Sequence, residues 1–104
     1  MTYNEINQII KKEKYVTLIF TSEKDFNSEN LGKTIHEFLK SNQKMKIYTF
    51  GYNKDYEIAR NFPINKFPTT IIYKKGKKIL LEDNLKHRLD IAHFVEKLPK
   101  NLKK

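Results

Sequence analysis

Two kinds of hydrophobic pattern alternate along this chain. Ile6, Ile9 and Ile10 follow the spacing of one helix face, as do the apolar residues of three later segments. In contrast, Tyr15 to Phe20 is a nearly continuous apolar run, which is typical of a strand buried on both faces. The pattern predicts helices at 2–12, from about 28 to about 41, at 56–62 and at 89–98, and strands at 15–20, 45–50, 69–73 and 78–82.

The order of these elements predicts the fold class. Strand–helix–strand crossovers favour right-handed parallel pairing, and the last two strands are close enough in sequence to form an antiparallel hairpin. Gly76 lies between them and supplies the positive backbone dihedral angle of a tight turn. We therefore expect an α/β fold with a mixed four-stranded sheet and helices on both faces. The length of 104 residues fits one domain over residues 1–104, with a basic tail at 100–104.

The chain is strongly basic, with a formal net charge of +9 and a pI of about 9.7. Such a charge is compatible with binding to phosphates or to an acidic partner. However, lysine is abundant here together with Asn, Ile and Tyr, as in proteins of AT-biased bacterial genomes, so a solvated basic surface is the simpler interpretation. The alternative is a basic module that binds nucleic acid or an acidic partner through Lys74, Lys75, Lys77, Lys78 and the tail.

One loop and one turn carry a resemblance to a known family. Phe67-Pro68-Thr69 and the following turn Lys75-Gly76 are similar to the proline loop and hairpin of thioredoxins. The resemblance extends from about Tyr15 to Leu98 and implies a thioredoxin-like fold, with a cis peptide bond before Pro68.

The same resemblance indicates which redox positions have changed. The two family cysteines correspond to Asp25 and Ser28, and the sequence contains no cysteine. A buried carboxylate, its partner lysine and a tryptophan of the family correspond to Ile19, Thr49 and Lys24. Because the thiolate is the attacking group in disulfide exchange, we expect a thioredoxin-like protein without oxidoreductase activity and without catalytic residues.

The resemblance also implies a binding surface beside the proline loop. An extended protein or peptide partner would pair with the backbone of Phe67 in the manner of a strand, while Phe26 and Phe67 form an apolar contact, with Asp25 and Ser28 at the rim. Alternatively, Asp25 and Ser28 only cap a helix, Phe26 packs inward and Pro68 only shapes the loop. The predicted groove consists of Asp25, Phe26, Asn27, Ser28, Phe67, Pro68 and Thr69.

Other classes of site have little support in the sequence. His36-Glu37 resembles the start of a His-Glu-x-x-His zinc motif, but Lys40 occupies the position of the second histidine, so we expect no metal. We also expect no cofactor, although an enzyme whose thiol comes from bound glutathione is a third possibility. No uninterrupted apolar stretch indicates a secretory signal or membrane insertion, and the expected location is the cytoplasm.

Overall fold

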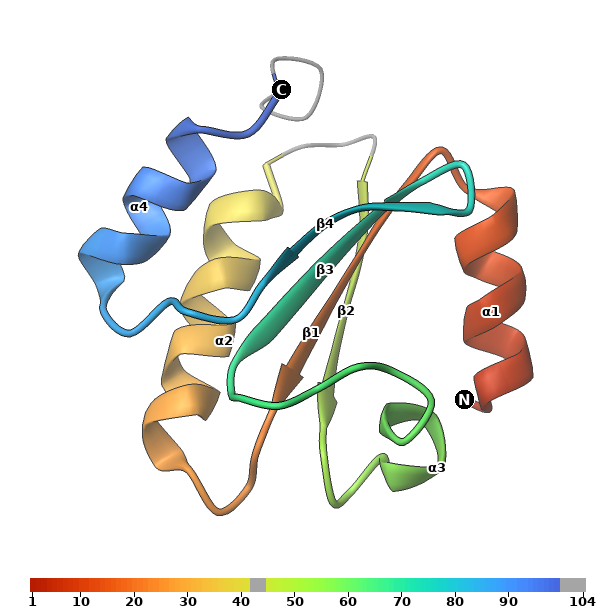
Figure 1. The fold of residues 1–104 in the computed structure, drawn as a ribbon, viewed down its shortest axis with the longest axis horizontal. Helices are drawn as coiled ribbons and strands as arrows, with labels where there is room; N and C mark the ends of the chain where they lie inside the picture. The colour runs from red at the N-terminus through yellow and green to blue at the C-terminus, as the bar shows by residue number, and fades with distance from the viewer. Residues whose placement is uncertain (42–44, 100–104) are drawn as a thin grey trace.

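A computed structural model describes residues 1–41 and 45–99, so the predicted basic tail at 100–104 lies outside the described residues. Within the described part, helices and strands follow one another in the predicted order (Figure 1). The elements are α1 (Tyr3–Lys12), β1 (Tyr15–Thr21), α2 (Phe26–Leu39), β2 (Met45–Gly51), α3 (Tyr56–Ala59), β3 (Thr69–Lys74), β4 (Lys77–Glu82) and α4 (Arg88–Glu96).

The strands form a mixed four-stranded sheet, as predicted, and their order in it is β2-β1-β3-β4. β1 and β2 are parallel, whereas β3 is antiparallel to β1 and β4 is antiparallel to β3. Parallel pairing was therefore the right expectation for the first crossover and is wrong for the second. The chain between β2 and β3 stays at the end of the sheet where β2 finishes, and its helix α3 rises only about 6 Å, so β3 starts from that same end.

Helices cover both faces of the sheet, which confirms the predicted layers (Figure 1). All seven residues of β1 are buried, as expected for the central run of the sequence. One core lies between the sheet and α2 and α4, and the other lies between the sheet and α1 and α3. The first core includes Ile19, Ile35, Ile72, Ile91 and Phe94, and the second includes Ile6, Leu18, Phe20, Ile58 and Ile71.

The helix that follows β1 begins close to its predicted start. α2 starts at Phe26, within the segment expected to be a turn up to Asn27, because the Asp25 side chain accepts a hydrogen bond from the backbone N–H of Ser28 and caps the first turn. Prolines mark other boundaries as predicted, with Pro63 after α3 and Pro99 after α4.

The hairpin between β3 and β4 turns on two residues with positive φ. Gly76 has a φ of 85°, as predicted, and Lys75 has a φ of 51°. The backbone N–H of Lys75 donates to the carbonyl of Lys14 at 2.9 Å, and the Cα of Lys11 lies 3.4 Å from where a side chain on Gly76 would begin. The turn is therefore held against the end of α1.

Candidate functional site

Three loops meet at one end of the sheet, where β1 and β2 end and β3 begins (Figure 1). Phe20 lies opposite Thr69 in the sheet, and Thr21 lies opposite Gly51. This register places the proline loop, the start of α2 and the turn after β2 around the same end of β1. All the residues of the predicted groove lie at this end of the sheet.

In the proline loop, a partly exposed aromatic residue precedes two buried residues. The Phe67–Pro68 peptide bond is cis, which is the form that the resemblance implied. Pro68 and Thr69 are buried, whereas Phe67 is half-buried. Within the described residues, the backbone N–H and C=O of Phe67 make no hydrogen bond. Neither backbone group of Phe67 is therefore used in holding the described part of the protein together.

The four residues at the start of α2 divide into an exposed and a buried part. Asp25, Phe26 and Asn27 are exposed, and Phe26 has 74% of its surface accessible. The alternative that Phe26 packs inward is therefore wrong. Ser28 is only 1% exposed, so its predicted place at the groove rim is also wrong.

Ser28 is instead part of the internal structure of the loop after β1. Its hydroxyl donates to the carbonyl of Asp25 at 2.8 Å and accepts from the backbone N–H of Ser22 at 3.1 Å. The capping role suggested for Asp25 is confirmed by its bond from the Ser28 N–H at 3.1 Å. Both side chains stabilise the start of α2, and Asp25 also remains exposed at the surface.

An aromatic group beside the proline loop was not recognised from the sequence. The ring of Tyr52 contacts those of Tyr56 and Phe67 edge to face, with both pairs of ring centroids 5.5 Å apart. Tyr56 is half exposed. The available signal was the position of Tyr52 directly after a strand that ends beside the groove. We call Tyr52, Tyr56 and Phe67 the aromatic patch.

Glu23 joins two of the three loops and was also missed as a structural residue. Its carboxylate accepts hydrogen bonds from the backbone N–H groups of Asn53 and Lys54, at 3.0 and 2.7 Å. Backbone N–H groups of Glu23 itself, Lys54 and Asn53 lower the pKa of this carboxyl below its ordinary value. The side chain therefore acts as an ionised anchor between the loops that follow β1 and β2.

Comparison with solved structures identifies this architecture. Thioredoxin of Plasmodium falciparum superposes with a TM-score of 0.78 at 19% identity, covering 94% of this chain and 95% of that one. Mitochondrial thioredoxin 3 from Saccharomyces cerevisiae superposes with a TM-score of 0.73 at 13% identity, covering 91% and 89%. The chain has the thioredoxin fold. No protein-family model and no curated protein sequence matches it.

Three positions were matched to redox residues by the resemblance to thioredoxins. None of them places an ionisable side chain in the core. Ile19 is fully buried in the core beneath α2, and Lys24 and Thr49 are exposed. Opposite Ile19, the buried hydroxyl of Thr70 has no hydrogen-bond partner among residues 1–41 and 45–99.

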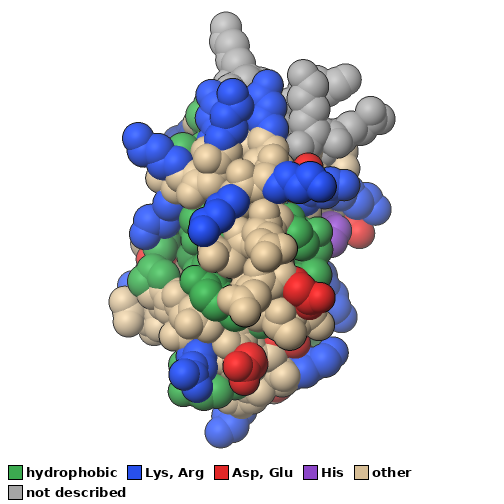
Figure 2. All heavy atoms as spheres, turned by 90° about the vertical axis from the view of Figure 1, so that its right-hand side faces the viewer, with side chains coloured by type: hydrophobic (Ala, Val, Ile, Leu, Met, Phe, Trp, Pro, Cys, Tyr) green, Lys and Arg blue, Asp and Glu red, His purple; other side chains and the backbone are tan. Residues whose placement is uncertain are grey.

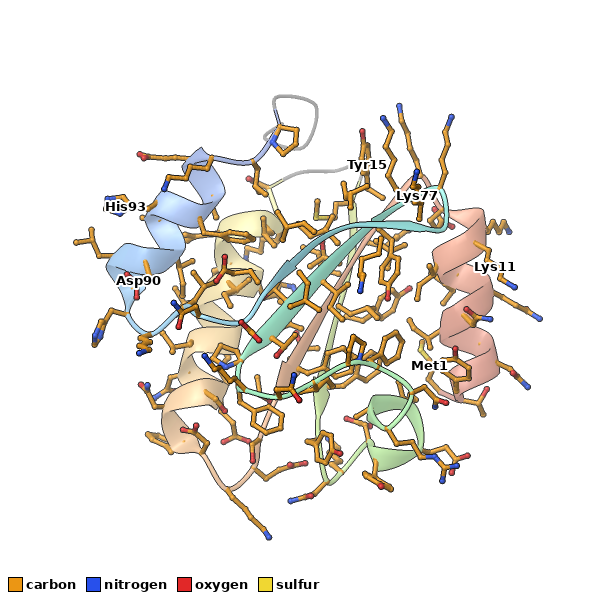
Figure 3. The ribbon with its side chains drawn as sticks, in the orientation of Figure 1. Met1, Lys11, Tyr15, Lys77, Asp90 and His93 are labelled. Atoms are coloured by element: carbon orange, nitrogen blue, oxygen red, sulfur yellow. The ribbon has the colours of Figure 1, made fainter. Side chains whose placement is uncertain are left out.

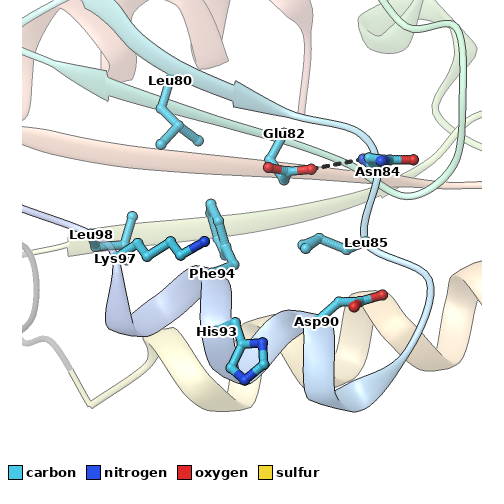
Figure 4. Close-up of a pocket in the computed structure, with 9 residues that line it drawn as sticks. All are labelled: Leu80, Glu82, Asn84, Leu85, Asp90, His93, Phe94, Lys97 and Leu98. Carbon is cyan, nitrogen blue, oxygen red and sulfur yellow. Dashed lines mark hydrogen bonds between the residues drawn. The ribbon is translucent and has the colours of Figure 1, made fainter.

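A hollow of about 430 Å³ lies between α4 and β4, where Leu80 and Phe94 face each other across it (Figure 4). The two carboxylates that line it accept hydrogen bonds from backbone N–H groups. Glu82 accepts from the N–H of Asn84, and Asp90 accepts from the N–H groups of Lys86 and His87. These bonds from Lys86 and His87 lower the pKa of the Asp90 carboxyl. The hollow therefore has an apolar floor and a rim occupied by internal bonds.

Among residues 1–41 and 45–99, no group of three or more His, Asp or Glu side chains is arranged to hold a metal ion. None of the helices in this part of the chain is both long and apolar enough to span a bilayer.

Proposed function

We propose that this protein binds an extended protein or peptide segment at the edge formed by the proline loop and the start of α2, and that it has no thiol–disulfide oxidoreductase activity. We place it in the cytoplasm. Two observations carry the proposal: the backbone of Phe67 makes no hydrogen bond within the described residues, and the ring of Phe26 is exposed at the same end of β1.

The absence of sulfur chemistry rests on the 104 residues of the sequence. With no cysteine, the chain has no thiolate to attack a disulfide and no second thiol to resolve a mixed disulfide. The apolar Ile19 beneath the loop supports the same reading, since a buried carboxylate without a task would cost several kcal/mol.

The binding mode follows from the groups left at the surface. The N–H of Phe67 can donate a hydrogen bond to a partner strand, and its C=O can accept one. Such backbone pairing supplies affinity that does not depend on the sequence of the partner. Phe26 and the aromatic patch flank this point with rings that are partly or largely exposed. Aromatic side chains of this kind dominate the energy of many interfaces, so they would set a preference for apolar side chains in the partner.

A peptide titration tests the groove directly. Arrayed 15-residue peptides would first select a binder, and its amide shifts would then be mapped on the protein. We expect shifts at Asp25 to Asn27 and at Phe67, and at least tenfold weaker binding for Phe26→Ala. Leu89→Ala is the matched control, because Leu89 is 66% exposed on α4. Equal effects of the two variants, or shifts confined to other residues, would refute the groove.

Two activity measurements address the enzymatic alternatives. Pure protein with dithiothreitol should not accelerate insulin reduction above the rate without protein. Titration with reduced glutathione should give no saturable amide shifts at the Phe67 loop. Turnover in the first assay would overturn the redox-inactive assignment, and specific binding in the second would favour an enzyme that borrows its thiol.

A further inference from the structure

Lysine side chains from two distant segments gather at the end of the sheet opposite the proposed groove. Figure 2 shows them at the upper end of the face that α1 covers, and Figure 3 shows Lys11 and Lys77 on neighbouring elements there. They come from the end of α1, the turn before β1 and the β3–β4 hairpin. We call this set the lysine cluster: Lys11, Lys12, Lys14, Lys74, Lys75, Lys77 and Lys78.

The backbone beneath the cluster holds these segments together. The Lys75 N–H donates to the Lys14 carbonyl at 2.9 Å, and the turn at Gly76 packs on Lys11. The Nζ atoms of Lys14 and Lys74 lie 5.7 and 5.9 Å from the centroid of the same Tyr15 ring. The positive charges are thus brought together by tertiary structure as well as by sequence.

The cluster concentrates like charges with little compensation. Lys74 and Lys77 lie directly opposite each other in the hairpin, an arrangement that weakens strand pairing. Glu13, which is half-buried at the end of α1, is the carboxylate within this stretch of sequence. None of the cluster lysines forms an ion pair within the described part of the chain. Repulsion among these ammonium groups is therefore present in the free protein.

Lys75 also departs from local preference. The first position of a turn with two positive φ angles favours Asn, Asp or Gly, and Lys75 occupies it with a φ of 51°. A lysine at this position makes the folded protein less stable than an asparagine would, but it adds a positive charge to the lysine cluster. Local departures from stability rules concentrate at functional sites.

We propose that the lysine cluster binds the phosphate backbone of double-stranded nucleic acid without sequence specificity. The Tyr15 ring that two of the lysines face is buried, so it offers no surface on which a base could stack. Lysine is a flexible point charge suited to phosphate oxygens rather than to base edges. Affinity then comes from counterion release, which a duplex supplies through its dense and regular charge.

This site is independent of the peptide groove. The cluster lies where β1 begins, and the proline loop lies where β1 ends (Figure 1). A failure of peptide binding would leave the nucleic-acid proposal intact, and the reverse also holds.

The first test compares two variants of equal charge. Lys14→Gln/Lys74→Gln/Lys77→Gln removes three charges from the cluster, and Lys33→Gln/Lys86→Gln/Lys97→Gln removes three exposed charges elsewhere. Binding to a 20-base-pair DNA duplex and to its RNA counterpart would be measured by fluorescence anisotropy. With four phosphate contacts, the slope of log K against log salt should be about −3.6, or roughly a 150-fold loss between 50 and 200 mM salt.

We expect the cluster variant to lose at least tenfold in affinity at 50 mM salt and the control variant to lose less than threefold. Absence of duplex binding at 50 mM salt, or equal losses in both variants, would overturn the proposal. Polyglutamate is the probe for an acidic protein, and tighter binding to it than to either duplex would also overturn the assignment.

A single substitution gives a signature that a general charge effect would not produce. Lys75→Asn should raise the melting temperature, because asparagine suits the left-handed backbone, and should make the salt slope less steep by about 0.9. Loss of stability together with unchanged duplex binding would contradict the assignment of Lys75 to the site.

Discussion

The backbone N–H of Lys54 donates a hydrogen bond of 2.7 Å to the carboxylate of Glu23, 31 residues earlier in the chain. The second oxygen of the same carboxylate accepts from the N–H of Asn53 at 3.0 Å. One ionised side chain thus fixes the loop that leads into α2 relative to the loop that carries Tyr52. Both loops border the proposed peptide groove, so their relative position depends on this contact.

Removing the charge of Glu23 should weaken the fold in a pH-dependent way. Because the pKa of Glu23 is lowered in the folded protein, its contribution is present above the ordinary glutamate pKa of about 4.3 and is lost as the pH falls through the lower folded value. Glu23→Gln should therefore lower the melting temperature at pH 7, and should flatten the fall in stability between roughly pH 5 and 3. Thermal unfolding followed by circular dichroism across this range provides the measurement.

The control for this experiment is Glu96→Gln, because Glu96 is exposed at the end of α4 and makes no hydrogen bond through its side chain among the described residues. An identical pH profile for Glu23→Gln and the unmodified protein would show that the carboxylate contributes no stability.

Gly51 should be intolerant of alanine for the same structural reason. A methyl group on Gly51 would overlap the Glu23 carboxylate, which is held in place by its two backbone bonds. We expect Gly51→Ala to destabilise the protein, although alanine is normally better than glycine inside a strand. In a Glu23→Ala background the same substitution should become neutral or stabilising. A double-mutant cycle in urea measures this coupling, and simple additivity of the two effects would contradict it.

Much of the fold could be predicted because its signals are local. Ile6, Ile9 and Ile10 define the buried face of α1, and the continuous apolar run from Tyr15 to Phe20 predicts the central strand. The direction of β3 was not accessible in this way, because it depends on whether the chain recrosses the sheet after β2. The connection that contains α3 stays at the end of the sheet where β2 finishes, and the pattern of apolar residues does not show on which side a connection remains.

The candidate site was less predictable because it depends on contacts across long sequence distances. The motif located Phe67 and Phe26 but did not reveal that Ser28 turns inward to bond with Ser22. The contact of Tyr52 with Phe67 likewise joins segments whose proximity comes only from the sheet register. Residue types in a motif indicate a position in the fold, whereas exposure is decided by the packing around it.

The buried hydroxyl of Ser28 should be important for stability rather than for binding. Ser28→Ala would leave the backbone N–H of Ser22 without its acceptor in a buried loop. We expect a loss of about 1–3 kcal/mol in the free energy of unfolding, measured by urea titration. Asn27→Ala, at an exposed neighbouring position, should change it by less than about 0.5 kcal/mol. Equal effects at both positions would exclude the proposed role of the hydroxyl.

Thr69 and Thr70 are adjacent, fully buried threonines with opposite expected responses to valine. The Thr69 hydroxyl donates to the carbonyl of Lys66, whereas the Thr70 hydroxyl has no partner within the described residues. Thr69→Val should therefore lower the free energy of unfolding by about 1–3 kcal/mol, and Thr70→Val should raise it by about 1 kcal/mol. Chemical denaturation of both variants decides the point, and a destabilising Thr70→Val would indicate that its hydroxyl is paired.

Restoring the carboxylate of redox-active thioredoxins at Ile19 should damage this protein. Ile19 is fully buried and lies opposite Thr70 in the sheet. Ile19→Asp should cost several kcal/mol at pH 7, because burial penalises the charged form and raises its pKa. An acid with a raised folded pKa is tolerated best when protonated, so the loss should grow as the pH rises above about 4, the ordinary aspartate value. Ile19→Asn introduces similar polarity without a charge and should show no such pH dependence. If both variants unfold at the same urea concentration from pH 4 to pH 8, the core at this position accommodates an ionised carboxylate, and the argument that it is adapted to the absence of thiol chemistry fails.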